Sequence, residues 1–223
     1  MHAPGGAQDD MVETTSSSEF TNALEKHAAR FGVELTAHDI ERLSDYYKLL
    51  NAWNARLHLV APCSPTEFAT RHVLESLLAI SHLHENARVA DVGSGAGLPI
   101  IPCLIVRHDL RATLIESSQK KAVFLREALQ LVGAHERSRV IAERFEKTLA
   151  PDVDFITCRA LDRFEEQFGK LLEWSPPQSR LLLYGGHNIR EQIERNDLSY
   201  VAVHIPESER RFLFIVERKA PVS

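Results

Sequence analysis

The spacing of hydrophobic residues along the chain changes near residue 88. Before that point, apolar side chains recur every three or four positions, which is typical of helices that bury one face. After it, short apolar runs alternate with segments of helical spacing, as in a protein built from strands and helices. The predicted strands are Arg88–Val92, Arg111–Ile115, Ser138–Ala142, Val153–Thr157 and Arg180–Tyr184.

Capping residues set the ends of the predicted helices. The first helix, over residues 19–34, has Gly32 as its stop, and Thr36 begins the second with Asp39 three residues further on. Residues 64–67 begin the third, because they combine a serine cap, a proline and an acid at the favoured positions. We therefore expect a helical cap over residues 19–85 and a second domain over residues 86–223. One helix of this second domain begins at Ser118 and stops at Gly133. Another begins at Asp162, which forms a capping box with Glu165.

Composition narrows the class of protein. The chain has 223 residues, of which 44% are hydrophobic, and this fits one large domain with a small appendage. No apolar run approaches the roughly 18 residues of a membrane span. Residues 1–18 are acidic and rich in Ser and Gly, so we expect a disordered tail and no signal peptide. Cys63, Cys103 and Cys158 lie far apart, so we expect reduced thiols in the cytoplasm and no bound metal. We also expect a monomer.

The charge balance argues against a protein that binds nucleic acid with its whole surface. Lys and Arg together number 26 against 31 for Asp and Glu, which gives a formal net charge of -5. Proteins dedicated to RNA binding usually carry a basic face. A local basic patch is compatible with this average, and the acidic balance suggests a partner that supplies part of the recognition surface.

Three alternating glycines follow the first predicted strand. Asp91 ends that apolar strand, and Gly93, Gly95 and Gly97 follow at every second position. Glycine permits a positive φ and brings no Cβ between the backbone and a ligand. A dinucleotide-binding turn would need a third glycine at position 98, where Leu98 stands. The pattern instead resembles the first motif of class I S-adenosylmethionine (SAM) methyltransferases.

The alternation of strands and helices predicts a mostly parallel sheet with helices on both faces. The C-terminal part differs, because residues 199–205 and 211–217 flank a polar turn as in an antiparallel hairpin. A parallel sheet that ends in one antiparallel hairpin is shared by class I methyltransferases. The predicted fold class is therefore α/β, a Rossmann-like, seven-stranded class I SAM-dependent methyltransferase with an N-terminal helical cap.

Acidic residues near the predicted strand ends are candidates for holding SAM. Glu116 directly follows the second strand, where an acid accepts hydrogen bonds from ribose hydroxyls. An acid at a helix N-terminus, favoured by the helix dipole, would have the same pattern. Residues 143–146 follow the third strand, where backbone and an apolar side chain would frame the adenine. Surface charge in a loop is the alternative there.

The end of the fourth strand usually indicates which atom is methylated. Residues 156–160 lack the Pro-Pro-aromatic sequence of enzymes that methylate exocyclic amines of bases. Cys103 follows a proline but lies after the glycine turn, so we interpret it as a core residue. Arg159 is then the main polar group expected at the pocket, or else it pairs with a neighbouring acid. A ring nitrogen such as guanine N7 needs no general base, so positioning would supply most of the catalysis.

Together these segments resemble the RsmG family, also called glucose-inhibited division protein B, over residues 20–219. The resemblance rests on residues 49–54, 71–77, 91–99, 120–125 and 159–160. It implies a methyltransferase acting on guanine N7 in small-subunit 16S ribosomal RNA, free or assembled in the subunit, with SAM as cofactor. It implies SAM contacts at Gly93, Leu98, Phe145, Glu146 and Arg159, in addition to those expected at Asp91, Gly95 and Gly97 of the glycine turn and at Glu116 after the second strand. It further implies a catalytic role for Arg159 and RNA contacts at Lys120, Lys121 and Arg144.

The chain departs from the family pattern at several positions. Val60 stands where the family often has Thr, Ile100 where Gly is common, and Phe145 where a small residue is frequent. After the fifth strand the family usually has a lysine followed by a glycine, and in this chain Gly185 stands at the position of that lysine. A small-molecule methyltransferase and a non-catalytic SAM-binding protein therefore remain alternatives, and a NAD-dependent enzyme is disfavoured by Leu98.

Overall fold

The computed structural model describes residues 6–159 and 164–218. Within them, seven strands form one sheet in the order β3-β2-β1-β4-β5-β7-β6. Strands β1 to β5 pair in parallel, and β7 pairs antiparallel with both β5 and β6. This arrangement confirms the predicted fold class. The strands are β1 (Arg88–Val92), β2 (Arg111–Ile115), β3 (Ser138–Ile141), β4 (Phe155–Cys158), β5 (Arg180–Gly185), β6 (Ser199–His204) and β7 (Phe212–Glu217).

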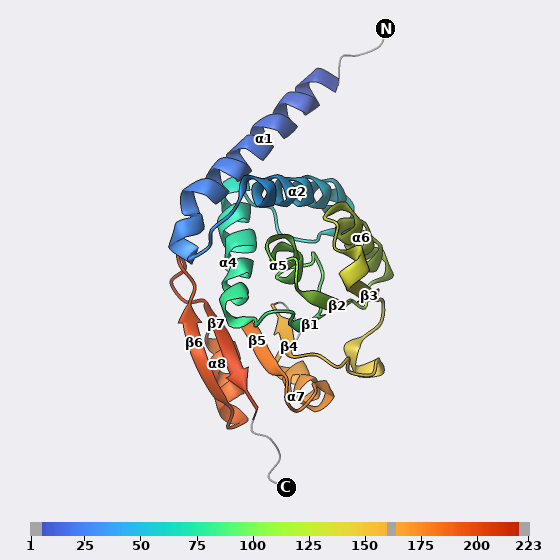
Figure 1. Cartoon of the computed structure of the whole chain (residues 1–223), viewed down its shortest axis with the longest axis vertical. Helices are drawn as coiled ribbons and strands as arrows, with labels where there is room; N and C mark the ends of the chain where they lie inside the picture. Colours follow the sequence, from blue (N-terminus) through green and yellow to red (C-terminus); the bar gives the residue numbers. More distant parts are fainter. Residues whose placement is uncertain (1–5, 160–163, 219–223) are drawn as a thin grey trace.

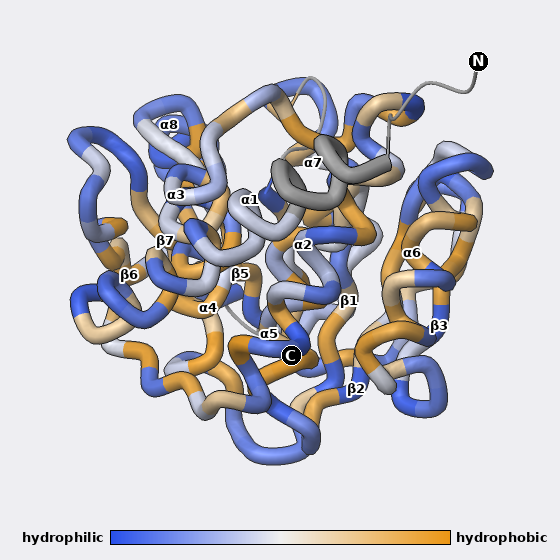
Figure 2. The backbone as a smooth tube through the Cα atoms, turned by 90° about the horizontal axis from the view of Figure 1, so that it is seen from above, coloured by the Kyte–Doolittle hydropathy of each residue, from blue (hydrophilic) through white to orange (hydrophobic). Residues whose placement is uncertain are grey.

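Helices cover both faces of the sheet. One face carries α5 (Ile100–Val106) and α6 (Gln119–Leu131), whose side chains join a core cluster with those of the cap. The other face carries α7 (Phe164–Trp174) and α8 (His187–Arg195), with a separate cluster around Phe168. Hydrophobic residues are concentrated along β1 and β2, whereas many of the connecting loops are hydrophilic (Figure 2). Two short helices, η4 (His135–Arg137) and η5 (Phe145–Lys147), flank β3.

The N-terminal cap lies beside α5 and α6 (Figure 1). Thr36 and Asp39 form the predicted capping box, and Ser64 accepts from the backbone N–H of Glu67 as predicted. Gly32 ends the first helical segment with a φ of 67°. The cap comprises α1 (Gly6–His27), η1 (Ala28–Phe31), α2 (Ala37–Leu57), α3 (Pro65–Glu67), η2 (Phe68–Leu74), α4 (Glu75–Leu77) and η3 (Leu78–His82).

The expectation of a disordered tail over residues 1–18 is wrong from Gly6 onward. Helix α1 begins at Gly6, and its N-terminal part extends away from the rest of the cap (Figure 1). Phe20 and Leu24 anchor the helix in the core. Because no proline or glycine follows between residues 7 and 27, extending an anchored helix costs little, and this outweighs the polar composition.

Smaller differences concern the boundaries of elements. Strand β4 begins two residues later than predicted and includes Cys158. The helix predicted from Ser64 is one helical segment whose middle part, η2, is a π-helix. Asp162, the predicted first residue of the next helix, lies outside the described residues, and α7 begins at Phe164. Cys103 is buried in α5, as expected of a core residue.

Candidate active site

The glycine turn after β1 folds over the end of β2. The backbone N–H groups of Gly93 and Ser94 donate to the carbonyl of Ile115, at 2.9 and 3.1 Å. Gly95 has a φ of 52°, and a Cβ there would meet only Gly93 O at 3.7 Å. A Cβ on Gly97 would lie 2.3 Å from the side chain of Ile101. A Cβ on Gly95 would therefore face mostly open space, whereas Gly97 allows α5 to pack against the turn.

A cavity of about 740 Å³ opens at the carboxyl ends of β1, β2 and β4. Open α/β sheets bind ligands at this edge, where the strand order reverses, and such pockets commonly hold small molecules. Among the predicted site residues, the cavity is lined by Gly93, Gly95, Leu98, Glu116, Lys121, Arg144, Phe145, Glu146 and Arg159. Asp91, Gly97 and Lys120 do not line it.

Backbone donors fix the carboxylate of Glu116 at the cavity wall. One oxygen accepts from Gly95 N–H at 2.9 Å, and the other accepts from Ser118 N–H at 2.7 Å. Ser118 is also the N-cap of α6, so the acid stands at a helix N-terminus as well as at the end of β2. Each carboxylate oxygen can accept a further hydrogen bond. The position expected of an acceptor for ribose hydroxyls and the position expected of an acid at a helix N-terminus are therefore the same in this structure.

Asp91 lies behind the glycine turn. Its Oδ1 accepts from Thr157 Oγ1 at 2.7 Å, across the β1–β4 pair. Its Oδ2 is buried and has no hydrogen-bond partner among the described residues. Burial raises the pKa of Asp91 to about 7. Tyr46, from α2, donates to the Ala96 carbonyl at 2.6 Å and so attaches the cap to the turn.

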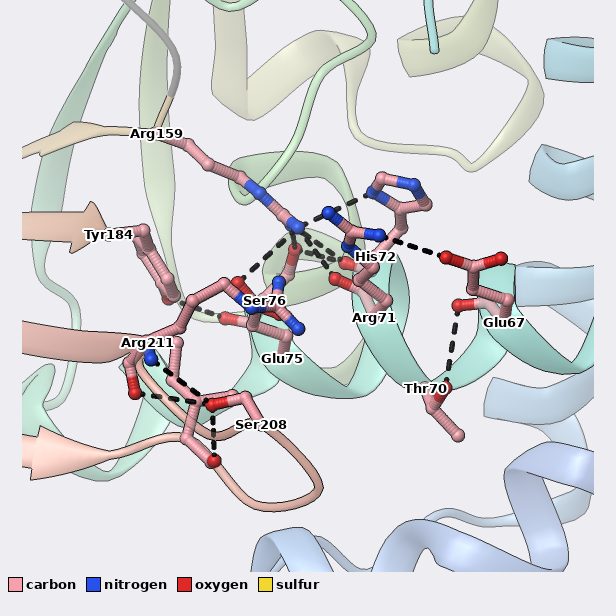
Figure 3. Close-up of polar contacts among 11 residues, drawn as sticks. Glu67, Thr70, Arg71, His72, Glu75, Ser76, Arg159, Tyr184, Ser208 and Arg211 are labelled. Atoms are coloured by element: carbon pink, nitrogen blue, oxygen red, sulfur yellow. Dashed lines mark hydrogen bonds and ion pairs between the residues drawn. The ribbon is translucent and has the colours of Figure 1, made fainter. Parts of the chain in front are cut away.

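The guanidinium of Arg159 is held by the cap (Figure 3). Nη2 donates to Arg71 O at 2.6 Å, and Nη1 donates to His72 O at 3.2 Å and to Ser76 Oγ at 3.1 Å. Nη2 also lies 3.4 Å from the carboxylate of Glu75. Arg159 therefore lines the cavity and also forms an ion pair with Glu75, so the two placements expected for this residue are not exclusive. Most of its donors are already engaged with the helical segment that contains η2.

Glu75 is a buried carboxylate between two arginines. Its side chain is 3% exposed, and it pairs with Arg211, directly before β7, as well as with Arg159. Tyr184, on β5, donates to the Ser76 carbonyl at 2.9 Å. These contacts attach the cap to β5, β7 and the end of β4, so the position of η2 depends on three segments distant in the sequence.

Sequence reasoning did not single out the chemistry of His72, which lines the cavity. Its Nδ1 lies 3.4 Å from Arg159 Nη2, and its ring packs against Phe68 with centroids 5.1 Å apart. Burial and the neighbouring arginines lower the pKa of His72 to about 3. The Arg71-His72 pair was part of the family resemblance, but only the fold shows that it faces the cavity. Gln167, also missed, lines the cavity, and its Oε1 has no partner among the described residues.

The charges at the cavity are mixed. Lys121 and Arg144 line it together with the acids Glu143 and Glu146, and Lys120 lies exposed on α6. No group of three or more His, Cys, Asp or Glu side chains suited to a metal ion occurs in the described ranges. None of the helices described is long and apolar enough to cross a membrane.

The sheet order, the glycine turn and the cavity at the carboxyl edge define a class I SAM-dependent methyltransferase fold. Solved structures support this class. A SAM-dependent methyltransferase from Aquifex aeolicus matches with a TM-score of 0.53 at 19% identity, covering 78% of this chain and 97% of its own. A ribosomal protein L11 methylase from Lactobacillus delbrueckii subsp. bulgaricus matches with a TM-score of 0.55 at 15% identity, covering 67% and 79%. At these identities the likeness concerns the fold alone.

Within this class, the chain belongs to the GidB family, described as rRNA small subunit methyltransferase G, whose family model matches residues 39–218. Curated relatives carry the name ribosomal RNA small subunit methyltransferase G. The protein from Sorangium cellulosum is 37% identical over 172 residues, covering 74% of this chain and 72% of its own length. The one from Nitrosococcus oceani is 34% identical over 183 residues, covering 82% and 85%. The family resemblance inferred from the sequence is confirmed.

Proposed function

We propose that this protein transfers a methyl group from SAM to guanine N7 in small-subunit (16S) ribosomal RNA. The observation that carries the proposal is the cavity between Glu116 and Arg159 at the carboxyl edge of the sheet. It occurs in a chain that belongs to the family described as rRNA small subunit methyltransferase G.

The residues around the cavity fit SAM as the methyl donor. Glu116 has lone pairs available for ribose hydroxyls while the backbone holds it in place. Gly95 leaves its backbone open to a ligand, and Phe145 offers an apolar surface for adenine, supported by Trp174 at 5.6 Å between ring centroids. Oε1 of Gln167 at the cavity wall has no hydrogen-bond partner among the residues that the structure describes, and a donor group on the ligand could pair with it. When bound, SAM supplies an electrophilic methyl group.

The side chains at the cavity favour a reaction that needs no general base. His72 is a poor base at neutral pH, because its pKa is about 3. Arg159 donates hydrogen bonds only. Guanine N7 carries its own lone pair, so orienting the base toward the methyl group is the main task of the protein.

The charge distribution favours a substrate that contributes recognition surface of its own. The formal net charge is -5, and Lys121 and Arg144 stand at the cavity beside Glu143 and Glu146. We assign RNA contacts to Lys120, Lys121 and Arg144, and the assembled small subunit as the substrate form. Such an enzyme acts in the cytoplasm, where its substrate lies, and as a monomer.

The proposal is tested by incubating the protein with methyl-labelled SAM. Separate reactions contain small subunits that lack methylation by this family, naked ribosomal RNA from them, or a metabolite extract. We expect label in the RNA of the small subunits. Label only in the metabolite extract would favour a small-molecule methyltransferase. Saturable SAM binding without transfer would identify a non-catalytic binding protein.

A further inference from the structure

The π-helix η2 presents backbone carbonyls to a side chain from another element. In η2, the N–H of Glu75 donates to the carbonyl of Thr70, five residues earlier. The carbonyls of Arg71 and His72 accept from Arg159. Widened turns of this kind occur often at functional sites. Here the widened turn places His72 at the cavity wall beside Arg159, which donates to the backbone of His72 (Figure 3).

The arginine also determines the tautomer of His72. A guanidinium donates hydrogen bonds and has no lone pair to accept one. His72 Nδ1 lies 3.4 Å from Arg159 Nη2, within hydrogen-bond reach, so this contact favours the tautomer in which Nδ1 carries the lone pair and accepts. In a neutral imidazole the hydrogen then resides on Nε2.

Burial of the ring, together with the charges around it, keeps His72 neutral. Arg71 lies beside it on η2, Arg159 reaches it from the end of β4, and Arg211 contributes from the start of β7. Glu67 pairs with Arg71, and the carboxylate of Glu75 is shared by Arg159 and Arg211, so three arginines face two carboxylates. Protonation of the ring is therefore disfavoured, and its pKa is low.

The Nε2–H group is available to a ligand. No hydrogen bond joins His72 Nε2 to another described residue, and this atom is not one of the described buried polar atoms that lack a partner. Leu59, Val60 and His72 bring the cap to the cavity, whereas Glu116 and Phe145 lie after β2 and β3. The cap therefore contributes lining residues of its own, besides the residues after β2 and β3 that fit SAM.

We propose that His72 Nε2–H donates a hydrogen bond to an acceptor on the methylated base, namely guanine O6. The inference rests on the proposed function. O6 and N7 lie on the same edge of guanine, so a donor on O6 aligns the base and leaves the N7 lone pair free. Arg159 acts through this contact, because it fixes the ring orientation and the tautomer of His72. Arg159 is thus a positioning residue for His72.

Two substitutions separate the hydrogen bond from the packing of the ring. His72→Phe keeps an aromatic ring against Phe68 but removes the donor, whereas His72→Asn keeps both an acceptor and a donor. The assay is single-turnover methylation of unmethylated small subunits at saturating SAM, with SAM affinity measured by calorimetry. We expect His72→Phe to lower the rate by about tenfold, the scale of one lost hydrogen bond, and His72→Asn to restore most of it. SAM affinity should stay within about threefold, a small difference on the free-energy scale.

A control and a spectroscopic measurement complete the test. His82→Phe changes a half-buried histidine that does not line the cavity, and it should leave the rate unchanged. Nitrogen NMR of the histidines should show His72 with hydrogen on Nε2 alone at pH 7. A hydrogen on Nδ1, a protonated ring at pH 7, or normal turnover of His72→Phe would each overturn the inference alone. A wild-type protein that does not methylate RNA would overturn both proposals.

Discussion

Replacing Arg159 with lysine keeps a positive charge at the cavity but removes the planar fork that holds η2. In the structure, Nη1 and Nη2 together reach two backbone carbonyls, Ser76 Oγ and the carboxylate of Glu75, all within 3.4 Å. A lysine ammonium is a compact charge with three donors, and it does not match the spread of these acceptors. We therefore expect Arg159→Lys to loosen η2 while the sheet stays folded.

The size of the effect follows from the contacts that are lost. If lysine keeps two of the four contacts, two hydrogen bonds to a charged group disappear, at about 1.5 kcal/mol each. Glu75 keeps its pair with Arg211, so no buried carboxylate is left without a partner. The free energy of unfolding should fall by about 3 kcal/mol, which lowers the melting temperature by roughly 6–12 °C in a domain of this size.

The assay combines calorimetric melting with single-turnover methylation at saturating SAM. Because His72 loses its anchor, turnover should fall by about tenfold or more, well beyond any change in SAM affinity. Arg180→Lys serves as the control, because Arg180 is an exposed residue paired with Glu217, and it should change stability by less than about 0.5 kcal/mol. Wild-type melting and turnover in Arg159→Lys would show that the guanidinium fork does not hold η2 in place. A loss explained wholly by weaker SAM binding would restrict Arg159 to the cofactor site.

Three further predictions concern the cavity. Glu116→Ala should weaken SAM binding, measured by calorimetry, by about 1–3 kcal/mol, and unchanged affinity would argue for a role at the helix terminus alone. Gly95→Val should abolish SAM binding in a folded protein, whereas Gly97→Ala should mainly lower the melting temperature, because its Cβ would meet Ile101. Normal SAM binding in Gly95→Val, or lost binding without lower stability in Gly97→Ala, would contradict these assignments. Since native Asp91 keeps its proton up to about pH 7, stability should fall as the pH rises from about 4 to 7, by about 4 kcal/mol from this group. Asp91→Asn should remove that decline in unfolding titrations across this range, and an unchanged slope would contradict the raised pKa.

Local signals explain why much of the fold could be predicted. The caps at Thr36 and Ser64 and the stop at Gly32 depend on neighbours within four residues, and all three were predicted. The glycine turn was also predicted, because its spacing follows a strand. The separate tasks of Gly95 and Gly97 were not, since they depend on where α5 packs.

Long-range contacts explain what could not be predicted. Arg159 was expected at the pocket, but its acceptors lie 83–88 residues earlier in the chain. Arg211, one of the two arginines that pair with Glu75, lies 136 residues away from it. The contacts that join η2 to Arg159 are therefore long-range, so no local pattern in residues 68–74 could indicate them.

The central claim is tested most directly by identifying the methylated atom. Small subunits are incubated with the protein and labelled SAM, and their RNA is digested to nucleosides and analysed by mass spectrometry. We expect labelled 7-methylguanosine, approaching one methyl group per subunit, with much less produced by Glu116→Ala. Label on another nucleoside or on protein, or no incorporation by a protein that binds SAM, would contradict that claim.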